Sequence, residues 1–176
     1  MNLIVAVDRN WAIGRKNELL FHIPEDMKFF RSKTLDRTVI CGKNTLLSFP
    51  GSKPLPRRRH IVLTRQDFPD TDQMTVAHSL QEMFDRIADL PEEDVFVIGG
   101  ETVYRQLYRS CKTLFVTHIQ ETAPDADSFF PNLKSEPDFV LREESPLMVS
   151  SSGLSYSFAT YENTNVRLDL MDSFVK

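Results

Sequence analysis

One acidic side chain on a short amphipathic stretch is the first feature of this sequence that points to chemistry. Pro24 favours the first position of a helix, because its fixed φ suits that position and its missing N–H is not needed there. The helix then brings Met27 and Phe30 onto one apolar face, with Asp26 on or beside it. Apolar neighbours disfavour the charged carboxylate and raise its pKa, so Asp26 is a candidate proton donor near neutral pH.

The same residues also fit a purely structural interpretation. The helix dipole stabilises anions in the first turn of a helix, and both Glu25 and Asp26 occupy that turn. Taken alone, the helix favours this structural interpretation. The choice depends on what the rest of the chain brings close to Asp26.

Composition describes an ordinary globular protein. The 176 residues are enough for one domain with a sizeable core, and 41% of them are hydrophobic and 26% charged. A net charge of -4 gives no reason to expect nucleic acid or an anionic membrane as a partner. No apolar run has the length of a membrane span or a secretory signal, and Cys41 and Cys111 indicate free thiols in a reducing compartment. We expect a cytoplasmic protein.

Short apolar segments alternate with helical patterns over the first two-thirds of the chain. Strands are predicted at 3–7, 38–42, within 57–64, around Val76, at 95–98 and at 114–119, and helices from Pro24, at 43–49, after Ser79 and through Tyr104 and Leu107. This alternation is typical of βαβ units in a mostly parallel sheet with flanking helices, an α/β fold. Segments 139–143 and 154–161 have no helix between them and predict a C-terminal antiparallel hairpin at one edge.

Two segments lie outside this regular pattern. Residues 8–17 are polar and are predicted to form a long loop after the first strand. Residues 163–176 form a C-terminal tail of unknown role after a single domain at residues 1–162. The apolar residues of this tail fit either a short amphipathic helix or a loose segment: Leu168, Met171 and Val175.

Three predicted strand ends carry residues that suit a polyphosphate. Gly42 to Thr45 and Gly99 to Thr102 each lead from a strand into a helix, where backbone N–H groups and the helix dipole favour anions. Arg65 follows a third strand, and its planar guanidinium fits a phosphate. Each motif alone also fits an ordinary turn or a solvated cation. Their convergence on one edge of a parallel sheet favours an extended polyphosphate ligand.

The remaining reactive residue types form no recognisable site in the sequence. Arg57, Arg58 and Arg59 fit either a charged strand start or carboxylate binding by one of the three. The cysteines and histidines have no zinc-type spacing, so no metal is expected, and no serine lies in a G-x-S-x-G motif. An acid near a polyphosphate ligand, without a metal or nucleophile, suggests proton donation coupled to hydride transfer.

The ordered set of motifs resembles the dihydrofolate reductase family. The resemblance runs from Leu3 to about Glu162 and rests, in order, on segments 4–7, 13–14, 23–30, 39–45, 54–58, 63–66, 97–104 and 114–119. It implies that NADPH reduces 7,8-dihydrofolate to 5,6,7,8-tetrahydrofolate, with hydride delivered to C6 and a proton to N5. This reaction supplies one-carbon metabolism and thymidylate synthesis. The implied partners are dihydrofolate and antifolate inhibitors, and we expect a monomer.

The resemblance also implies roles on the substrate side. Asp26 would promote protonation of N5, Thr117 would bond Asp26 and a pterin-linked water, and Phe21 stands where the family usually has tryptophan. Arg58 would pair with the glutamate α-carboxylate. The other implied substrate residues are Ile4, Met27, Phe30, Phe49, Lys53, Leu55 and Ile98, with the carbonyls of Ile4 and Ile98 facing the pterin.

The implied NADPH contacts fall into three groups. On the nicotinamide side they are Ala6, Ile13 and Gly14. Around the adenosine and its 2′-phosphate they are Gly42, Lys43, Asn44, Thr45, Leu63, Thr64 and Arg65. At the pyrophosphate turn, where the family has a cis Gly–Gly bond, they are Gly99, Gly100, Glu101, Thr102, Val103 and Tyr104.

The chain departs from the family pattern at Leu20-Phe21, where Pro-Trp is usual. Phe21 cannot donate an indole hydrogen bond to an active-site water, and the catalytic loop loses a proline. Leu46 stands where an aromatic is common, and Thr102 where some members have arginine. Two other functions stay open: a pyrimidine reductase of riboflavin synthesis, against which Asp26 and Arg58 argue, and a non-catalytic pterin- or nucleotide-binding protein.

Overall fold

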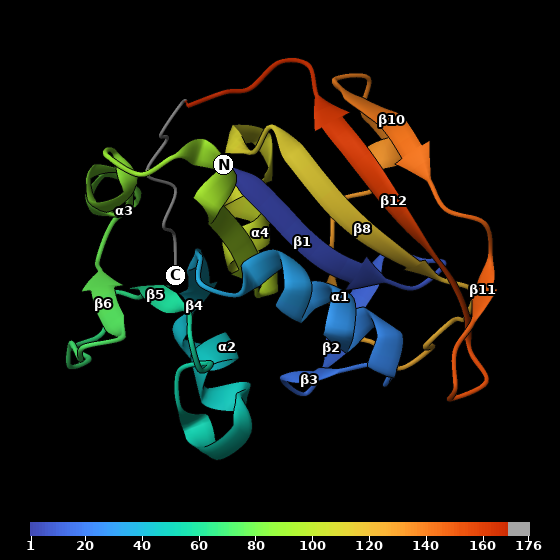
Figure 1. Ribbon diagram of the computed structural model, residues 1–176, viewed down its shortest axis with the longest axis horizontal. Helices are drawn as coiled ribbons and strands as arrows, with labels where there is room; N and C mark the ends of the chain where they lie inside the picture. Colours follow the sequence, from blue (N-terminus) through green and yellow to red (C-terminus); the bar gives the residue numbers. More distant parts are fainter. Residues whose placement is uncertain (169–176) are drawn as a thin grey trace.

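A nine-stranded sheet forms the centre of the protein, in the order β10-β12-β8-β1-β7-β4-β5-β6 with β11 beside β12 (Figure 1). The computed structural model describes residues 1–168. The pairs that join β8, β1, β7, β4, β5 and β6 are parallel, whereas β12 is antiparallel to β8, β10 and β11. The predicted parallel sheet with an antiparallel edge is confirmed. The strands are β1 (Asn2–Val7), β4 (Thr38–Gly42), β5 (Arg59–Leu63), β6 (Met74–Ala77), β7 (Val95–Gly99), β8 (Thr113–Ile119), β10 (Phe139–Glu144), β11 (Met148–Val149) and β12 (Ser155–Asn163).

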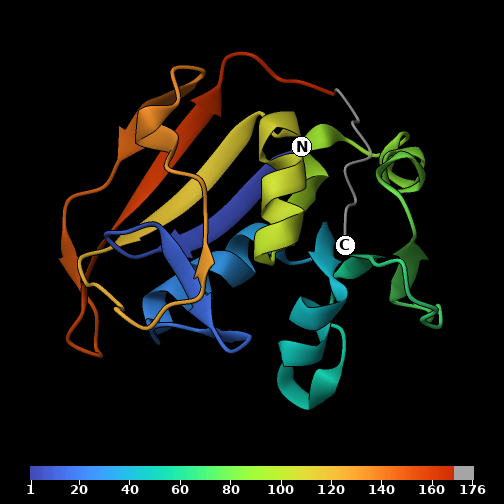
Figure 2. The same ribbon diagram turned by 180° about the vertical axis from the view of Figure 1, so that it is seen from behind.

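Helices cover both faces of this sheet. Helix α1 (Pro24–Thr34) lies over the face of the sheet that is nearer in Figure 1. Helix α4 (Glu101–Leu107) covers the opposite face, which is nearer in Figure 2. Two further helices, α2 (Lys43–Ser48) and α3 (Leu80–Ile87), follow β4 and β6 in the chain.

The central strands are buried on both faces, which explains their continuous apolar sequences. In β1, Leu3 and Val5 join the cluster that includes Leu107 of α4. Ile4 joins a second cluster, against which Phe30 of α1 packs. Successive side chains of a strand point to opposite faces, so one apolar run serves two cores.

The segment predicted as a long loop, residues 8–17, contains the first half of a β-hairpin, so that prediction was wrong. Its two-residue turn consists of Lys16 and Asn17, with φ of 49° and 62°. Positive φ at both positions is the geometry of a type I′ hairpin turn, which matches the twist of the strands. Such a short strand carries little periodic signal. The small sheet consists of β2 (Ala12–Arg15), β3 (Glu18–Leu19) and β9 (Ser128–Phe129), in the order β3-β2-β9.

Asp8 fixes this hairpin to the end of β1. Its side chain is buried, and its Oδ1 atom accepts hydrogen bonds from the N–H groups of Asn10 and Ala12, at 2.8 and 2.9 Å. Its Oδ2 atom accepts one from the N–H of Ala123, at 2.9 Å. One carboxylate therefore ties the hairpin to the segment that leads to β9.

The C-terminal part of the described chain lies along the start of β10. β12 ends at Asn163, and the N–H groups of Thr164 and Arg167 donate to the carbonyls of Asp138 and Arg109. The helix suggested through Met171 and Val175 lies outside the described residues.

Both cysteines are buried and free, as expected. Burial raises the pKa of the Cys41 and Cys111 thiols to about 12, so both stay protonated at neutral pH. Among residues 1–168, no helix combines the length and apolar character needed to cross a bilayer.

The predicted helix cap at Ser79 gives a test of the fold. The Ser79 hydroxyl accepts a hydrogen bond from the Glu82 N–H at 3.1 Å and begins α3. We expect Ser79→Ala to lower the free energy of unfolding by about 1 kcal/mol, as loss of a cap commonly does. Urea denaturation at pH 7 measures this change. Ser32→Ala is the control, because the Ser32 hydroxyl only donates to a carbonyl of its own helix; equal losses in the two variants would contradict the capping role.

Candidate active site

The site begins where two neighbouring strands part. β1 and β7 pair at Asn2 with Phe96 and at Leu3 with Val97, whereas β1 stays paired with β8 as far as Val7. The carboxyl-terminal halves of β1 and β7 therefore diverge and open the sheet between them. Parting of strands at the carboxyl edge is where open α/β sheets bind ligands.

Tyr104 bridges the point of divergence. Its buried hydroxyl lies 2.8 Å from the carbonyl oxygen of Ile4 and 2.9 Å from that of Ile98. Its single proton serves one carbonyl at a time, and burial raises its pKa, so the hydroxyl stays protonated. Two carbonyl oxygens that converge on one hydroxyl form a paired acceptor for the N–H groups of a ligand.

Gly99 makes room for this tyrosine. A Cβ atom on Gly99 would lie 3.1 Å from the Tyr104 ring, and the residue has φ of +121°. The Gly99–Gly100 peptide bond is cis, as the resemblance implied.

The acid predicted from the sequence lies beside the same opening. Asp26 is in the first turn of α1, and the hydroxyl of Thr117, buried in β8, donates to its Oδ1 atom at 2.6 Å. Burial raises the pKa of the Asp26 carboxyl, and the hydrogen bond from Thr117 opposes this in part. Asp26 therefore keeps its proton to a higher pH than an ordinary aspartate.

A cavity of about 30 Å³ borders Asp26, with Phe21 and Met27 among its lining residues. It has room for a water molecule. Phe21 lines this space, and its phenyl ring has no N–H to donate to it. Met27 is 48% exposed and lines this cavity, whereas Phe29 and Phe30 pack against the hydrophobic cluster that includes Ile4.

Arg58 is held rigidly at the far end of α1. Its Nε donates to Thr34 Oγ1 at 3.2 Å, and its Nη1 donates to the carbonyl of Pro56 at 2.9 Å. Burial lowers the pKa of Arg58, yet a guanidinium stays charged at neutral pH. The guanidinium is therefore a preoriented cation suited to a carboxylate.

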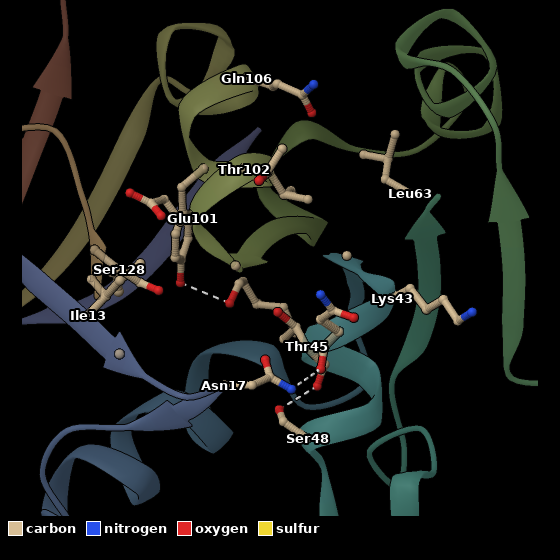
Figure 3. A pocket seen from close by; sticks show the side chains of 18 of the residues that line it. Ile13, Asn17, Lys43, Thr45, Ser48, Leu63, Glu101, Thr102, Gln106 and Ser128 are labelled. Carbon is tan, nitrogen blue, oxygen red and sulfur yellow. Dashed lines mark hydrogen bonds between the residues drawn. The ribbon is translucent and has the colours of Figure 1, made fainter. Parts of the chain in front are cut away.

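A cleft of about 700 Å³ opens beside the ends of β1 and β7, with Val5, Ala6 and Ile98 among its lining residues. Every residue predicted to contact the cofactor lines it except Gly99, which lies behind Tyr104. Figure 3 shows Lys43 and Thr45 of α2, and Thr102 of α4, around this opening. Gln66 ends the 63–66 motif but was not assigned a contact. Several other lining residues carried no recognisable motif and were not predicted: Asn17, Glu18, Leu19, Ser48, Gln106, Asp127 and Ser128.

The shape of the cleft fits an extended phosphate-bearing ligand. A Cβ atom on Gly100 would lie 3.1 Å from Thr45 Oγ1, and one on Gly42 would lie 3.3 Å from Val103. These two glycines thus let the N-terminal turns of α2 and α4 approach closely at the cleft, where helix N-termini favour anions. Lys43, which donates to Gln66 and lies 5.3 Å from the Phe68 ring centroid, adds positive charge at one side, as does Arg65.

The β2–β3 turn reaches across this cleft. The Asn17 side-chain amide donates to the carbonyl of Asn44, at the start of α2, at 2.9 Å. This bond joins the hairpin to the opposite wall (Figure 3). In the sequence, the only indication of this contact is Asn17 itself, because asparagine tolerates the positive φ that a tight turn needs.

Comparison with known proteins agrees with this geometry. Residues 1–163 match the family model described as dihydrofolate reductase. The chain belongs to the dihydrofolate reductase family. The dihydrofolate reductase of Bacillus subtilis (strain 168) is 32% identical over 165 residues, which cover 94% of this chain and 95% of that protein. The enzyme of Neisseria meningitidis serogroup A is 36% identical over 162 residues, which cover 92% and 96%.

A solved structure is also similar. The dihydrofolate reductase of Enterococcus faecalis, complexed with NADP(H) and RAB-propyl, has a TM-score of 0.79 and 33% sequence identity. The match covers 92% of this chain and 94% of that one. The expected dihydrofolate reductase fold is therefore confirmed.

The raised pKa of Asp26 makes a prediction about stability. The folded state holds the Asp26 proton more tightly than the unfolded state, in which the pKa has its ordinary value of 3.8. The free energy of unfolding therefore falls as the pH rises from 3.8 to the raised pKa of the folded state. We expect Asp26→Asn to be more stable than the parent at pH 7, and the gain to vanish below that ordinary pKa. Urea denaturation between pH 3 and pH 8 measures it.

Glu25 is the matched control with the opposite sign. Hydrogen bonds from the Ser150 hydroxyl and the Ser151 N–H lower its pKa to about 2, so its carboxylate adds stability at neutral pH. Glu25→Gln is expected to lose stability at pH 7. A loss in Asp26→Asn as well would contradict the burial argument.

Proposed function

We propose that Asp26 donates the proton in the family reaction and that the 700 Å³ cleft holds NADPH. The reaction is the NADPH-dependent reduction of 7,8-dihydrofolate to 5,6,7,8-tetrahydrofolate, which supplies one-carbon metabolism. One observation carries the proposal: the cavity beside Asp26 and the cleft share Ala6, Ile13 and Leu19 as lining residues. The acid thus adjoins the compartment that fits the cofactor.

In this proposal, different residues of the cleft bind different parts of the cofactor. NADPH supplies the hydride. The turns at Gly42 and Gly100 offer N–H groups to its phosphates, and Lys43 and Arg65 offer positive charge to the 2′-phosphate. Ala6, Ile13 and Gly14 form the nicotinamide side.

The opening between β1 and β7 receives the pterin in this proposal. Asp26 bonds the amide and amino side of the pterin and promotes protonation of N5, and the carbonyls of Ile4 and Ile98 face the pterin. Thr117 orients the Asp26 carboxyl. Water in the neighbouring cavity connects the acid to the ring nitrogen.

The rest of dihydrofolate extends along α1 toward its C-terminal end. Arg58 binds the glutamate α-carboxylate through a charged hydrogen bond, for which its fixed guanidinium is suited. The side chains proposed to enclose the pterin and benzoyl rings are Met27, Phe30, Phe49, Lys53 and Leu55. Antifolate inhibitors bind in the same place.

The compartment and assembly belong to the same proposal. The two buried, free thiols support a reducing compartment, the cytoplasm. A monomer is supported because one chain supplies the acid, the cleft and Arg58.

Steady-state oxidation of NADPH in the presence of dihydrofolate tests the reaction. Turnover is the expected result. Binding of NADPH without turnover would identify a binding protein instead, and turnover of a pyrimidine substrate alone would identify a reductase of riboflavin synthesis.

Removal of the acid tests the proton donor. We expect Asp26→Asn to lower the hydride-transfer rate by about a hundredfold or more at pH 7, the usual contribution of a positioned acid. The rate should recover in part at acidic pH, where solvent supplies the proton. Stopped-flow measurement from pH 5 to pH 9 gives both values.

Glu25→Gln serves as the control for this pH profile. The Glu25 carboxyl titrates at about 2, so its removal leaves the shape of the profile between pH 5 and pH 9 unchanged. A uniform loss in Asp26→Asn at every pH would argue against proton delivery.

Cofactor preference tests the 2′-phosphate assignment. We expect the parent to favour NADPH over NADH. In the double variant Lys43→Ala/Arg65→Ala, the ratio of kcat/KM for NADPH to kcat/KM for NADH should fall by about tenfold or more, because charged hydrogen bonds to phosphate are strong. Arg142→Ala is the control, because Arg142 of β10 pairs with Glu162 of β12, and neither residue lines the cleft. Equal use of NADH by the parent would contradict the assignment.

A further inference from the structure

His60 contacts three of the residues expected around the substrate without being one of them. It is fully buried in β5. Its Nε2 lies 3.1 Å from the backbone nitrogen of Leu55, and its Nδ1 lies 3.2 Å from the carbonyl oxygen of Arg58. Its ring meets that of Phe49 edge to face, with 6.1 Å between centroids.

The two hydrogen bonds select one protonation state of the ring. The Leu55 N–H can only donate, so Nε2 is the acceptor and carries no proton. The Arg58 carbonyl can only accept, so Nδ1 carries the proton and donates. Burial lowers the pKa of His60 to about 4, which keeps this neutral form at pH 7.

The turn that His60 holds has few backbone hydrogen bonds of its own. Pro54 and Pro56 have no N–H to donate, and Arg57 has φ of 58°, a value that few side chains adopt. The imidazole connects the two ends of this turn, from the Leu55 N–H to the Arg58 carbonyl. Together with the bond from Arg58 Nη1 to the Pro56 carbonyl, the imidazole fixes the Leu55 segment relative to Arg58.

We propose that His60 is a positioning residue that aligns Leu55, Phe49 and Arg58 for the benzoylglutamate half of dihydrofolate. The inference rests on the proposed function. His60 acts through the three residues that it contacts, while the pterin end depends on Asp26, Thr117 and the divergence of β1 and β7. Its substitution is therefore expected to weaken recognition of the benzoylglutamate group and to leave the chemical step and NADPH binding intact.

The test compares two substrates in His60 variants. Dihydrofolate carries the benzoylglutamate group, and 6-methyl-7,8-dihydropterin lacks it. For His60→Gln we expect KM for dihydrofolate to rise by about tenfold with kcat within about twofold, because a buried carbonyl loses its donor. The kcat/KM for the dihydropterin and the Kd for NADPH are expected to stay within about twofold of the parent values.

A second variant separates the two hydrogen bonds. An asparagine amide lies near the position of Nδ1 and can still donate to the Arg58 carbonyl, whereas a glutamine carbonyl lies near Nε2 and can still accept from Leu55. We expect His60→Asn to keep more of the parent's affinity for dihydrofolate than His60→Gln, because Arg58 contributes the charged contact. Thermal unfolding verifies that both variants are folded.

Met83→Ala is the control for destabilisation alone. Met83 is fully buried in the cluster on the α4 side of the sheet, whereas Phe49 packs on the α1 side. Its truncation should lower stability without changing the ratio of kcat/KM for the two substrates. Equal losses on both substrates in the His60 variants, or an unchanged KM for dihydrofolate in a folded variant, would overturn the inference. A parent that reduces neither substrate would instead refute the proposed function.

Discussion

The divergence of β1 from β7 is the constraint on which the rest of the site depends. Because pairing ends after Leu3 and Val97, the carbonyls of Ile4 and Ile98 lose their ladder partners while remaining inside the protein. Tyr104 supplies one hydroxyl, which donates to one of the two carbonyls at a time. α1 approaches from one side with the acid, and the helix turns at Gly42 and Gly100 approach from the other, so the opening separates a substrate side from a cofactor side.

Glu25 and Asp26 are neighbours in one helical turn, yet their surroundings shift their pKa values in opposite directions. Glu25 faces the Ser150 hydroxyl and the Ser151 N–H, which lower its pKa to about 2 and make it a permanent anion. Asp26 faces the interior, where burial raises its pKa despite the bond from Thr117. The helix dipole acts on both residues, so it cannot explain the difference; solvation and hydrogen bonding do. One carboxylate ties α1 to the loop before β12, and the other is available for chemistry.

Long apolar runs and capped helices could be predicted from the sequence, because each carries its own local signal. The β4 segment, the Ser79 cap of α3 and the Pro24 start of α1 all lie where the sequence indicates. The short strands β2, β3, β9 and β11 could not, since two to four residues show no period and their pairing depends on partners far along the chain. At the site, glycines at strand ends identified the cleft. Asn17 acts through a hydrogen bond to Asn44, far along the chain, which no local pattern encodes. His60 acts through two hydrogen bonds to its own turn, at Leu55 and Arg58, and no motif in the sequence indicates them.

The central place of β1 also affects the order in which the chain can fold during synthesis. β1 is made before the other strands of this sheet, yet Asn2 pairs with Phe96 and Thr113, on strands made much later. Its apolar run must wait, without either neighbour, until more than half of the chain has been translated. Long-range parallel pairing of this kind slows folding and leaves apolar surface exposed to aggregation or chaperone binding. The strand that defines the active site is therefore also the one whose burial comes latest relative to its synthesis.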